Sequence, residues 1–336
     1  MHIHILSAVV SLAFVGSRRL ARASLGALAV LATAGSACAG DYPSRAIRVI
    51  VPSGAGGAAD IGARLAAEAL GRVLRTSVVV ENRRNGLSAI DVYLAGEPDG
   101  YTILVGAAGL FTISPAAKQV PYDVERDFIP LGTIWRSSHM LAARPSLGVR
   151  TLAEFIAAAK ARPAAISIGS TGVGTPSHLA IELLKREAGI DVIHVPFRGS
   201  GESLPALVSG QIDALIGDVQ VVAPQITAGT SRGIAVAATH RAPSLPDVPT
   251  MGEAGLPGVI AETWFGYVVS AKTPPATVRR LQDALAATHD DPAYRESLAR
   301  QGVSAGDAGP APFARLIRTD TAKWRAIVTA AGIRLD

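Results

Sequence analysis

Short apolar runs that alternate with helical patterns constrain the fold of this chain more than any other feature. The runs are IRVIVP, SVVVEN, YTILVG, AISIGS, DVIHVPF, DALIGD and GIAVAAT. They are bounded by Gly, Pro, Asp or Asn, which is typical of buried parallel strands. Parallel strands need long crossover connections, and the helical segments between the runs supply them. The alternation therefore predicts an α/β architecture with right-handed crossovers.

Capping signals and apolar faces locate several of the helices. After the first run, Ile61 and Leu70 share one helical face, and Asp60 is placed to cap the helix. Thr151 and Glu154 form a capping box at the start of another helix. Three more helical patterns lie near the C-terminus, in PPATVRRLQDALAATH, DPAYRESLARQG and APFARLIRTDTAKWRAIVTAAG. The length of the chain, 336 residues, suggests about two domains.

The N-terminal segment indicates export. In SRRLARASLGALAVLATAGSACAG, a basic stretch precedes a short apolar core and a small-residue end. We therefore expect residues 1–39 to be a Sec-type signal peptide cleaved after Ala39, and the mature protein to be periplasmic. Lipid attachment at Cys38 and twin-arginine export through Arg18 and Arg19 stay open as alternatives. The apolar core is shorter than the roughly 20 residues that a membrane span requires.

Composition and motif searches exclude several classes of function. Lys and Arg total 32 against 27 Asp and Glu, and no basic block follows the signal, so nucleic-acid binding is not expected. The single cysteine lies in the signal, so we expect no disulfide in the mature protein. The histidines lack metal-ligand spacing, and no G-x-S-x-G nucleophile motif occurs. We expect no metal, no cofactor and no enzymatic activity.

Two glycine turns are the strongest candidates for a binding site. The first is Gly54-x-Gly56-x-x-Ala59, and the second is Gly172-x-Gly174; each follows a predicted strand and precedes a predicted helix. A helix N-terminus has unpaired N–H groups and a partial positive charge, and glycine lets a ligand oxygen approach the backbone. Each turn therefore predicts an anion seat, although tight strand-to-helix turns without a ligand have the same pattern.

The first turn also has the spacing of a dinucleotide-binding loop. Glu81 in the next predicted strand would then be the ribose acceptor. It lies farther from the glycines than the usual spacing of about 20 residues, and the export signal argues against a nicotinamide cofactor. A dinucleotide-binding oxidoreductase is therefore only a distant alternative.

The mature chain resembles the Bug family along essentially its whole length. The resemblance is carried by DYPSRAIRVIVPSGAGGAADIGARLAAEAL, VVVENR, PDGYTILVGA, STGVGTPSHLA, HVPFRGSGESLPALVSGQIDAL, LPDVPTMGEAGLPG and KWRAIVTAAGIRLD. Bug proteins are periplasmic solute-binding proteins of tripartite tricarboxylate transporters. The resemblance thus implies a receptor that captures a small organic acid and delivers it to integral-membrane permease subunits. We expect a monomer.

The family's fold would be an α/β, two-lobed periplasmic-binding-protein fold of type II-like topology with a double-crossover hinge. The resemblance implies that residues 40–139 and 252–336 form the first lobe and residues 140–251 the second. The lobes would close on a ligand held between them, and the permease would recognise the closed state.

The resemblance places ligand contacts on loops of both lobes. The ligand-binding residues expected on this basis are Ser53, Gly54, Gly56, Gly57, Ala58, Asp60, Ala107, Ala108, Ser170, Thr171, Gly172, Val173, Gly174, Thr175 and Asp218. They include both glycine turns, so the anion seats and the family's contacts coincide.

The chain departs from the family pattern at these loops. Ser53 stands in place of an aromatic residue, Ala58 and Ala59 in place of hydroxyl residues, and Val173 in place of asparagine. Backbone donors remain, so we expect carboxylate capture with a shifted specificity. Asp218 leaves open a ligand with an amine, such as an amino acid. The further alternatives are an extracytoplasmic sensor for a two-component system and an orphan that binds another ligand class, for example a nicotinamide-like compound.

Overall fold

The computed structural model describes residues 42–331. Residues 42–44 belong to a separate unit, and a compact unit begins at Arg45. The predicted signal peptide, residues 1–39, lies outside the described residues. Among the residues described, no helix has both the length and the apolar character needed to cross a membrane.

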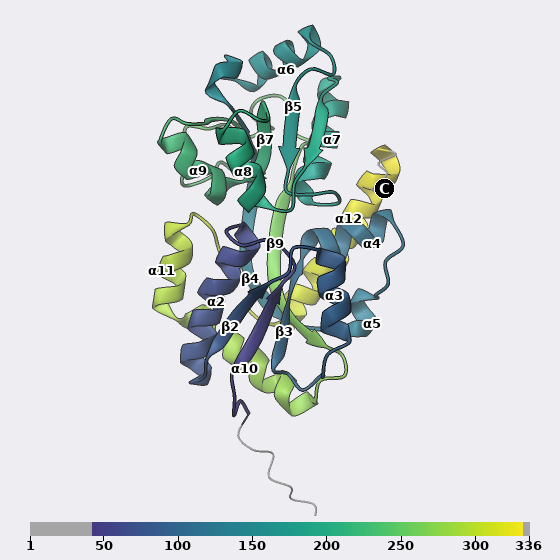
Figure 1. Ribbon diagram of the computed structural model, residues 1–336, viewed down its shortest axis with the longest axis vertical. Coiled ribbons are helices and arrows are strands. Elements are labelled where there is room, and N and C mark those ends of the chain that lie inside the picture. Colours follow the sequence, from purple (N-terminus) through teal and green to yellow (C-terminus); the bar gives the residue numbers. More distant parts are fainter. Residues whose placement is uncertain (1–41, 332–336) are drawn as a thin grey trace, which may run out of the picture. The chain divides into compact units, whose positions relative to one another are not determined.

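The compact unit is built on nine β-strands, and the predicted α/β architecture is confirmed (Figure 1). The strand order is β2-β1-β3-β9-β4-β7-β5-β6, and β8 also pairs with β4. All seven predicted apolar runs form strands, and the structure adds β4 and β9. The prediction of parallel pairing is wrong for β8, which pairs antiparallel with β4. The bounds are β1 (Ile47–Val51), β2 (Val78–Asn82), β3 (Thr102–Ala107), β4 (Phe128–Ala143), β5 (Ser167–Ser170), β6 (Ile193–Pro196), β7 (Ala214–Asp218), β8 (Arg232–Ala237) and β9 (Glu262–Ser270).

Strand β4 joins two sheets because its two halves have different partners. Its residues 128–138 pair antiparallel with β9, whereas residues 139–143 pair antiparallel with β7 and β8. The first sheet is β2-β1-β3-β9-β4, and the second is β8-β4-β7-β5-β6. Figure 1 shows β4 and β9 running between the part of the chain that carries β1–β3 and the part that carries β5–β7.

Helices connect the strands and cover the sheets. They are α2 (Ala58–Leu74), α3 (Gly86–Leu94), α4 (Ser114–Ala117), α5 (Val124–Asp127), α6 (Leu152–Ala161), α7 (Pro176–Ala188), α8 (Ser200–Val208), α9 (Val219–Thr227), α10 (Pro275–Asp290), α11 (Pro292–Arg300) and α12 (Pro310–Ala331), with a π-helical turn η1 (Gly109–Ile113) and a 3-10 turn η2 (Pro145–Leu147). The capping box of Thr151 and Glu154 is confirmed at the start of α6. The three C-terminal helices are also confirmed.

One capping prediction is wrong. Helix α2 begins at Ala58 with Gly57 as its N-cap, and Asp60 lies inside the first turn. Asp60 Oδ2 accepts a hydrogen bond from the backbone N–H of Gly56, 2.9 Å away. The carboxylate therefore folds back on the turn before the helix and does not cap the helix N–H groups.

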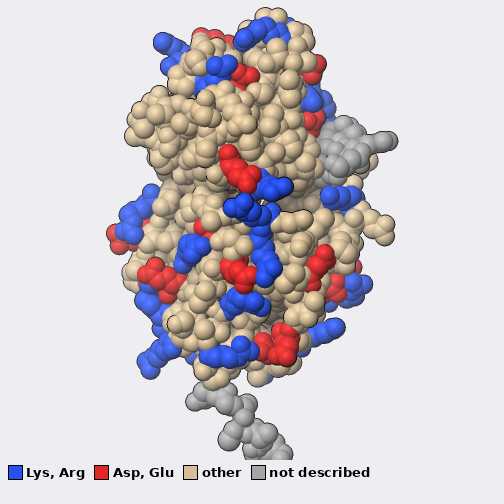
Figure 2. Space-filling model, in the orientation of Figure 1, with Lys and Arg blue, Asp and Glu red and all other residues tan. Residues whose placement is uncertain are grey.

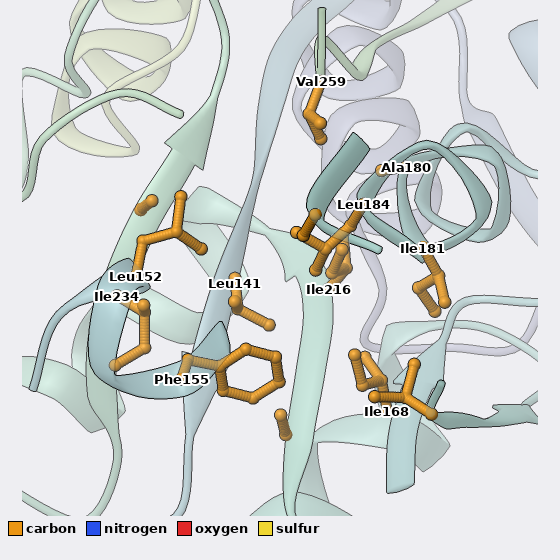
Figure 3. Close-up of a cluster of buried hydrophobic side chains, with 14 of the residues drawn as sticks. Leu141, Leu152, Phe155, Ile168, Ala180, Ile181, Leu184, Ile216, Ile234 and Val259 are labelled. Atoms are coloured by element: carbon orange, nitrogen blue, oxygen red, sulfur yellow. The ribbon is translucent and has the colours of Figure 1, made fainter. Parts of the chain in front are cut away.

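The second sheet has its own core of buried apolar side chains (Figure 3). Phe155 of α6 and Leu184 of α7 pack over Leu141 and Ile216 in the same cluster of buried side chains. The cluster also contains Met251, Val259 and Ala261, which lie between β8 and β9. We therefore propose that the chain passes to the second lobe between residues 138 and 139 and returns between 261 and 262, later than the predicted 252.

The core of the first sheet is aromatic. Phe111, Tyr122 and Phe128 contact one another, with ring centroids 5.0 Å apart for Phe111 and Phe128, 6.4 Å for Phe111 and Tyr122, and 6.2 Å for Tyr122 and Phe128. Phe111 and Phe128 are at least 97% buried, with 1% and 3% exposure, and each contributes about 1.5–3 kcal/mol by leaving water. This cluster fixes η1, which follows β3 and borders the site described next.

Candidate functional site

A cavity of about 600 Å³ lies where loops of the two sheets meet. On the first side it is lined by the loops that follow β1, β2 and β3. On the second side it is lined by the loops that follow β5 and β6 and by the end of β7. These are the C-terminal ends of the strands, where ligands of open α/β sheets bind.

The structure brings most of the predicted site residues to this cavity. Those that line it are Ser53, Gly57, Ala58, Ala107, Thr171, Gly172, Val173, Gly174, Thr175 and Asp218. Those that do not line it are Gly54, Gly56, Asp60, Ala108 and Ser170.

The residues outside the cavity shape its walls. Ala108 and Ser170 are fully buried, and Ser170 Oγ lies 2.6 Å from His194 Nε2. Burial alone would raise the pKa of Asp60, but hydrogen bonds from Arg64 and the Gly56 N–H outweigh it and hold that pKa below its ordinary value. Asp60 therefore stabilises the first glycine turn as an anion. We expect no direct ligand contact from it.

The N-terminus of α2 is open to the cavity. Its N-cap, Gly57, has no side chain to accept from the first turn, and no other side chain caps it. The backbone N–H groups of Ala58 and Ala59 stand at the first two helical positions, where no intrahelical acceptor exists. Both residues line the cavity at 2% and 6% exposure. This end of a 17-residue helix therefore offers unpaired donors and positive potential to an anion.

The second glycine turn is different, because side chains of the turn and of α7 accept hydrogen bonds from its backbone N–H groups. Helix α7 is capped by Thr175, whose hydroxyl accepts from the N–H of His178 at 3.4 Å. Three more backbone N–H groups donate to side chains: Thr171 N to Ser177 Oγ at 3.0 Å, Gly172 N to Ser170 Oγ at 3.2 Å, and Gly174 N to His178 Nδ1 at 3.2 Å. This turn lines the cavity, but it lacks the open helix end that its spacing predicted.

An open helix end on the second side belongs to α8. Its N-cap is Gly199, with φ 113°, and no side chain caps it. Gly199 and Ser200 line the cavity. A Cβ built on Gly57 would lie 3.6 Å from the backbone N of Ser200, so the N-termini of α2 and α8 face each other. This helix end was not predicted from the sequence, although Gly199-x-Gly201 after a predicted strand indicates such a turn.

Two buried ionisable side chains lie on the second side of the cavity. His139 of β4 and Asp218 of β7 are antiparallel partners, with Nε2 and Oδ1 3.6 Å apart and exposures of 2% and 4%. Ser200 Oγ donates to Asp218 Oδ2 at 2.7 Å, and His139 Nδ1 lies 3.1 Å from the carbonyl oxygen of Ala261. His139 was not predicted as a site residue.

Strand β9 adds one aromatic wall. Phe265 lines the cavity, and its neighbour Trp264 points into the first core, because successive strand residues face opposite sides. Trp264 meets Phe313 at 5.1 Å between ring centroids and donates its Nε1–H to Asp320 Oδ2 at 2.7 Å.

Two stacked histidines, His178 and His194, contact residues of the second glycine turn. The rings of His178 and His194 are 4.1 Å apart and nearly parallel. Burial lowers the pKa of each to about 4. Both are therefore neutral at pH 7, which lets His178 Nδ1 accept from Gly174.

The acidic residue required by the dinucleotide alternative does not reach the cavity. Glu81 Oε2 lies 3.4 Å from Arg48, and its Oε1 lies 2.5 Å from Arg83. Glu81 is not among the lining residues. Nor do the described residues contain a group of three or more His, Cys, Asp or Glu side chains that could hold a metal ion.

Residues 62–333 match the model of the tripartite tricarboxylate transporter family receptor. The chain belongs to this family. It is 31% identical to the protein BugT of Bordetella pertussis over 312 residues, which cover 91% of this chain and 96% of BugT. Family membership also identifies the chain as a receptor, which confirms what the resemblance to the Bug family implied.

Solved structures confirm the two-lobed fold. A periplasmic transporter is similar at a TM-score of 0.84 and 33% identity, over 88% of this chain and 100% of that one. An R. palustris protein solved with adipate is similar at 0.83 and 30%, over 88% and 99%. MatC from Rhodopseudomonas palustris, with bound malate, is similar at 0.80 and 29%, over 85% and 100%.

Proposed function

We propose that this receptor captures a small organic acid between its lobes in the periplasm and delivers it to membrane permease subunits. The observation that carries the proposal is the pair of uncapped helix N-termini, at Gly57 and Gly199, that adjoin each other at the wall of the cavity. Carboxylate oxygens satisfy free N–H groups and favour the positive ends of both helix dipoles.

The relatives support a carboxylate as the ligand. Adipate and malate, named with two of the similar structures, are both small dicarboxylates. In this chain the hydroxyl residues typical of the first turn are replaced by Ala58 and Ala59, which leaves the backbone as the source of donors there. Capture through backbone N–H groups is tolerant of the rest of the ligand, so we expect the other cavity residues to set specificity.

Ligand binding favours closure because the two open helix ends belong to different lobes. A carboxylate that contacts both Ala58 and Ser200 makes all its hydrogen bonds only when the lobes are together, and this difference in affinity stabilises the closed state. The permease would recognise that state. A sensor for a two-component system would use the same closure, and a test of transport in cells that carry or lack the permease separates the two roles.

Binding can be tested by thermal unfolding of protein that has been denatured and refolded to remove bound ligand. The panel contains dicarboxylates, monocarboxylates, amino acids, nicotinamide and its dinucleotide. At 100 times Kd, a ligand stabilises the folded protein by about 2.7 kcal/mol, which raises Tm by a few degrees. We expect the shift with carboxylates. A shift with dinucleotide alone, or with none of the acids, would contradict the proposal, and a shift confined to amino acids would assign a role to Asp218 as an amine acceptor.

A further inference from the structure

The cationic side chains of the cavity suggest which acids this receptor prefers. Arg84 and Arg198 are the lysine or arginine residues among the lining residues, and both are exposed. Arg84 lies in the loop between β2 and α3, and Arg198 in the loop between β6 and α8. One guanidinium therefore comes from each side of the cavity.

Neither guanidinium has a partner within the described part of the chain. Adjacent Arg83 is paired with Glu81 at 2.5 Å, whereas no hydrogen bond or ion pair of the Arg84 side chain occurs among residues 42–331. Glu202 is the acidic residue nearest in sequence to Arg198, and its carboxylate accepts from the backbone N–H of Arg198 at 3.3 Å, not from the guanidinium. Figure 2 shows basic side chains gathered where the two parts of the compact unit meet.

Closure brings these two positive charges to one cavity. The backbone carbonyl oxygen of Arg198 is 3.5 Å from the position of a Cβ on Gly54, so the Arg198 loop packs directly on the first side. Two like charges in one cavity repel, and an anion between them converts the repulsion into attraction. The buried carboxylate of the cavity, Asp218, is already bonded to Ser200 and faces His139, so it does not compensate them.

We propose that Arg84 and Arg198 determine specificity by holding a second anionic group of the ligand at the mouth of the cavity. The inference rests on the proposed function: the first carboxylate occupies the open ends of α2 and α8, and the ligand extends to the exposed arginines. The preferred ligand is therefore a dicarboxylate, and a monocarboxylate of equal length binds more weakly.

The test compares Kd values for dicarboxylates of four to eight carbons with those for monocarboxylates of the same length. Calorimetry is performed on the wild-type protein, the Arg84→Gln Arg198→Gln variant and the control Arg280→Gln. Arg280 is exposed on α10 and does not line the cavity. Because exposed charge pairs contribute modestly, we expect the double variant to lose about tenfold in affinity for the best dicarboxylate, with monocarboxylate affinity unchanged.

The outcomes distinguish failure of the inference about Arg84 and Arg198 from failure of the proposed function. A preference for dicarboxylates that disappears in the double variant and persists in Arg280→Gln supports the inference. Binding of both acid types with equal changes, or with no change, in the double variant overturns it and leaves the proposed function standing. Failure of the wild-type protein to bind any acid contradicts the proposed function, and the inference fails with it. Both arginines are exposed, so an unchanged Tm of the free variants serves as the check that they fold.

Discussion

Gly201, in the first turn of α8, faces the carbonyl oxygen of Ala55 so closely that a Cβ at position 201 would lie 2.5 Å from that oxygen. The two residues belong to opposite sides of the cavity. The absence of a side chain at Gly201 therefore permits the observed approach of the lobes, and closure can be tested at this one position.

We predict that Gly201→Ala weakens ligand binding by preventing full closure. Overpacking typically costs about 1–3 kcal/mol, or roughly five- to 150-fold in Kd. The free protein can relieve the clash by opening, so its Tm should change little. Calorimetry gives Kd, and small-angle X-ray scattering reports ligand-induced compaction. Gly54→Ala is a matched control where the same two sides of the cavity meet, because its Cβ would lie 3.5 Å from the carbonyl oxygen of Arg198, an ordinary van der Waals distance. Equal effects of the two substitutions would contradict the role of Gly201.

Val173 offers a test of how specificity is set. It lines the cavity and is 45% exposed in the second glycine turn. Val173→Asn adds a side-chain donor there, and one hydrogen bond contributes about 0.5–1.5 kcal/mol, so we expect Kd for polar acids to fall two- to tenfold. Val208 is equally exposed, at 45%, but does not line the cavity, so Val208→Asn should leave Kd unchanged. An identical Kd in wild type and Val173→Asn would contradict a role for residue 173 in ligand binding.

His139 and Asp218 should be energetically coupled because they are buried 3.6 Å apart. A double-mutant cycle with His139→Gln and Asp218→Asn, measured by urea unfolding, should give a coupling of about 1–3 kcal/mol. The exposed pair Arg241–Glu253 is the reference, and its coupling should stay below about 1 kcal/mol. Additive effects at His139 and Asp218 would show that the two side chains do not interact.

Acid should destabilise the fold through the stacked histidines. Burial lowers the pKa of His178 and of His194 from 6.5 to about 4. Between these values the unfolded chain binds more protons than the folded one, so stability is full above pH 6.5 and falls as pH decreases to about 4. The free energy of unfolding at pH 7 and pH 4.5 should differ less in His194→Gln than in wild type. The same substitution at exposed His240 is the control, and an unaltered pH dependence in His194→Gln would contradict the assignment.

The two strands that were not predicted from the sequence, β4 and β9, contain residues that disfavour strands. Strand β4 includes Pro130 and Gly132, and a shift in its register with β9 between these two residues accommodates them. Strand β9 includes Gly266, where a Cβ would lie 2.3 Å from the Phe313 ring. Only the tertiary structure reveals this requirement, because Phe313 comes from a distant helix. The other strands are continuous apolar runs and were predictable.

The candidate site, like the fold, could be predicted from the sequence only in part. Two turns with nearly the same glycine spacing differ because Ser177 and His178 occupy donors of the second turn, whereas Gly57 leaves those of α2 free. Spacing alone does not distinguish a turn that bonds to itself from one that is open to a ligand. His139 reaches the cavity through the crossing strand β4, so it could not be placed before that strand was known.

The central claim is that a carboxylate is held by the facing N-termini of α2 and α8. A crystal structure with the tightest-binding acid from the thermal panel tests it most directly. We predict a carboxylate group within hydrogen-bonding distance of the backbone N–H groups of Ala58 or Ala59, with Ser200 on the opposite side. A carboxylate bound instead at the turn of residues 171–175, with the end of α2 unoccupied, or an acid bound outside the cavity, would contradict the account.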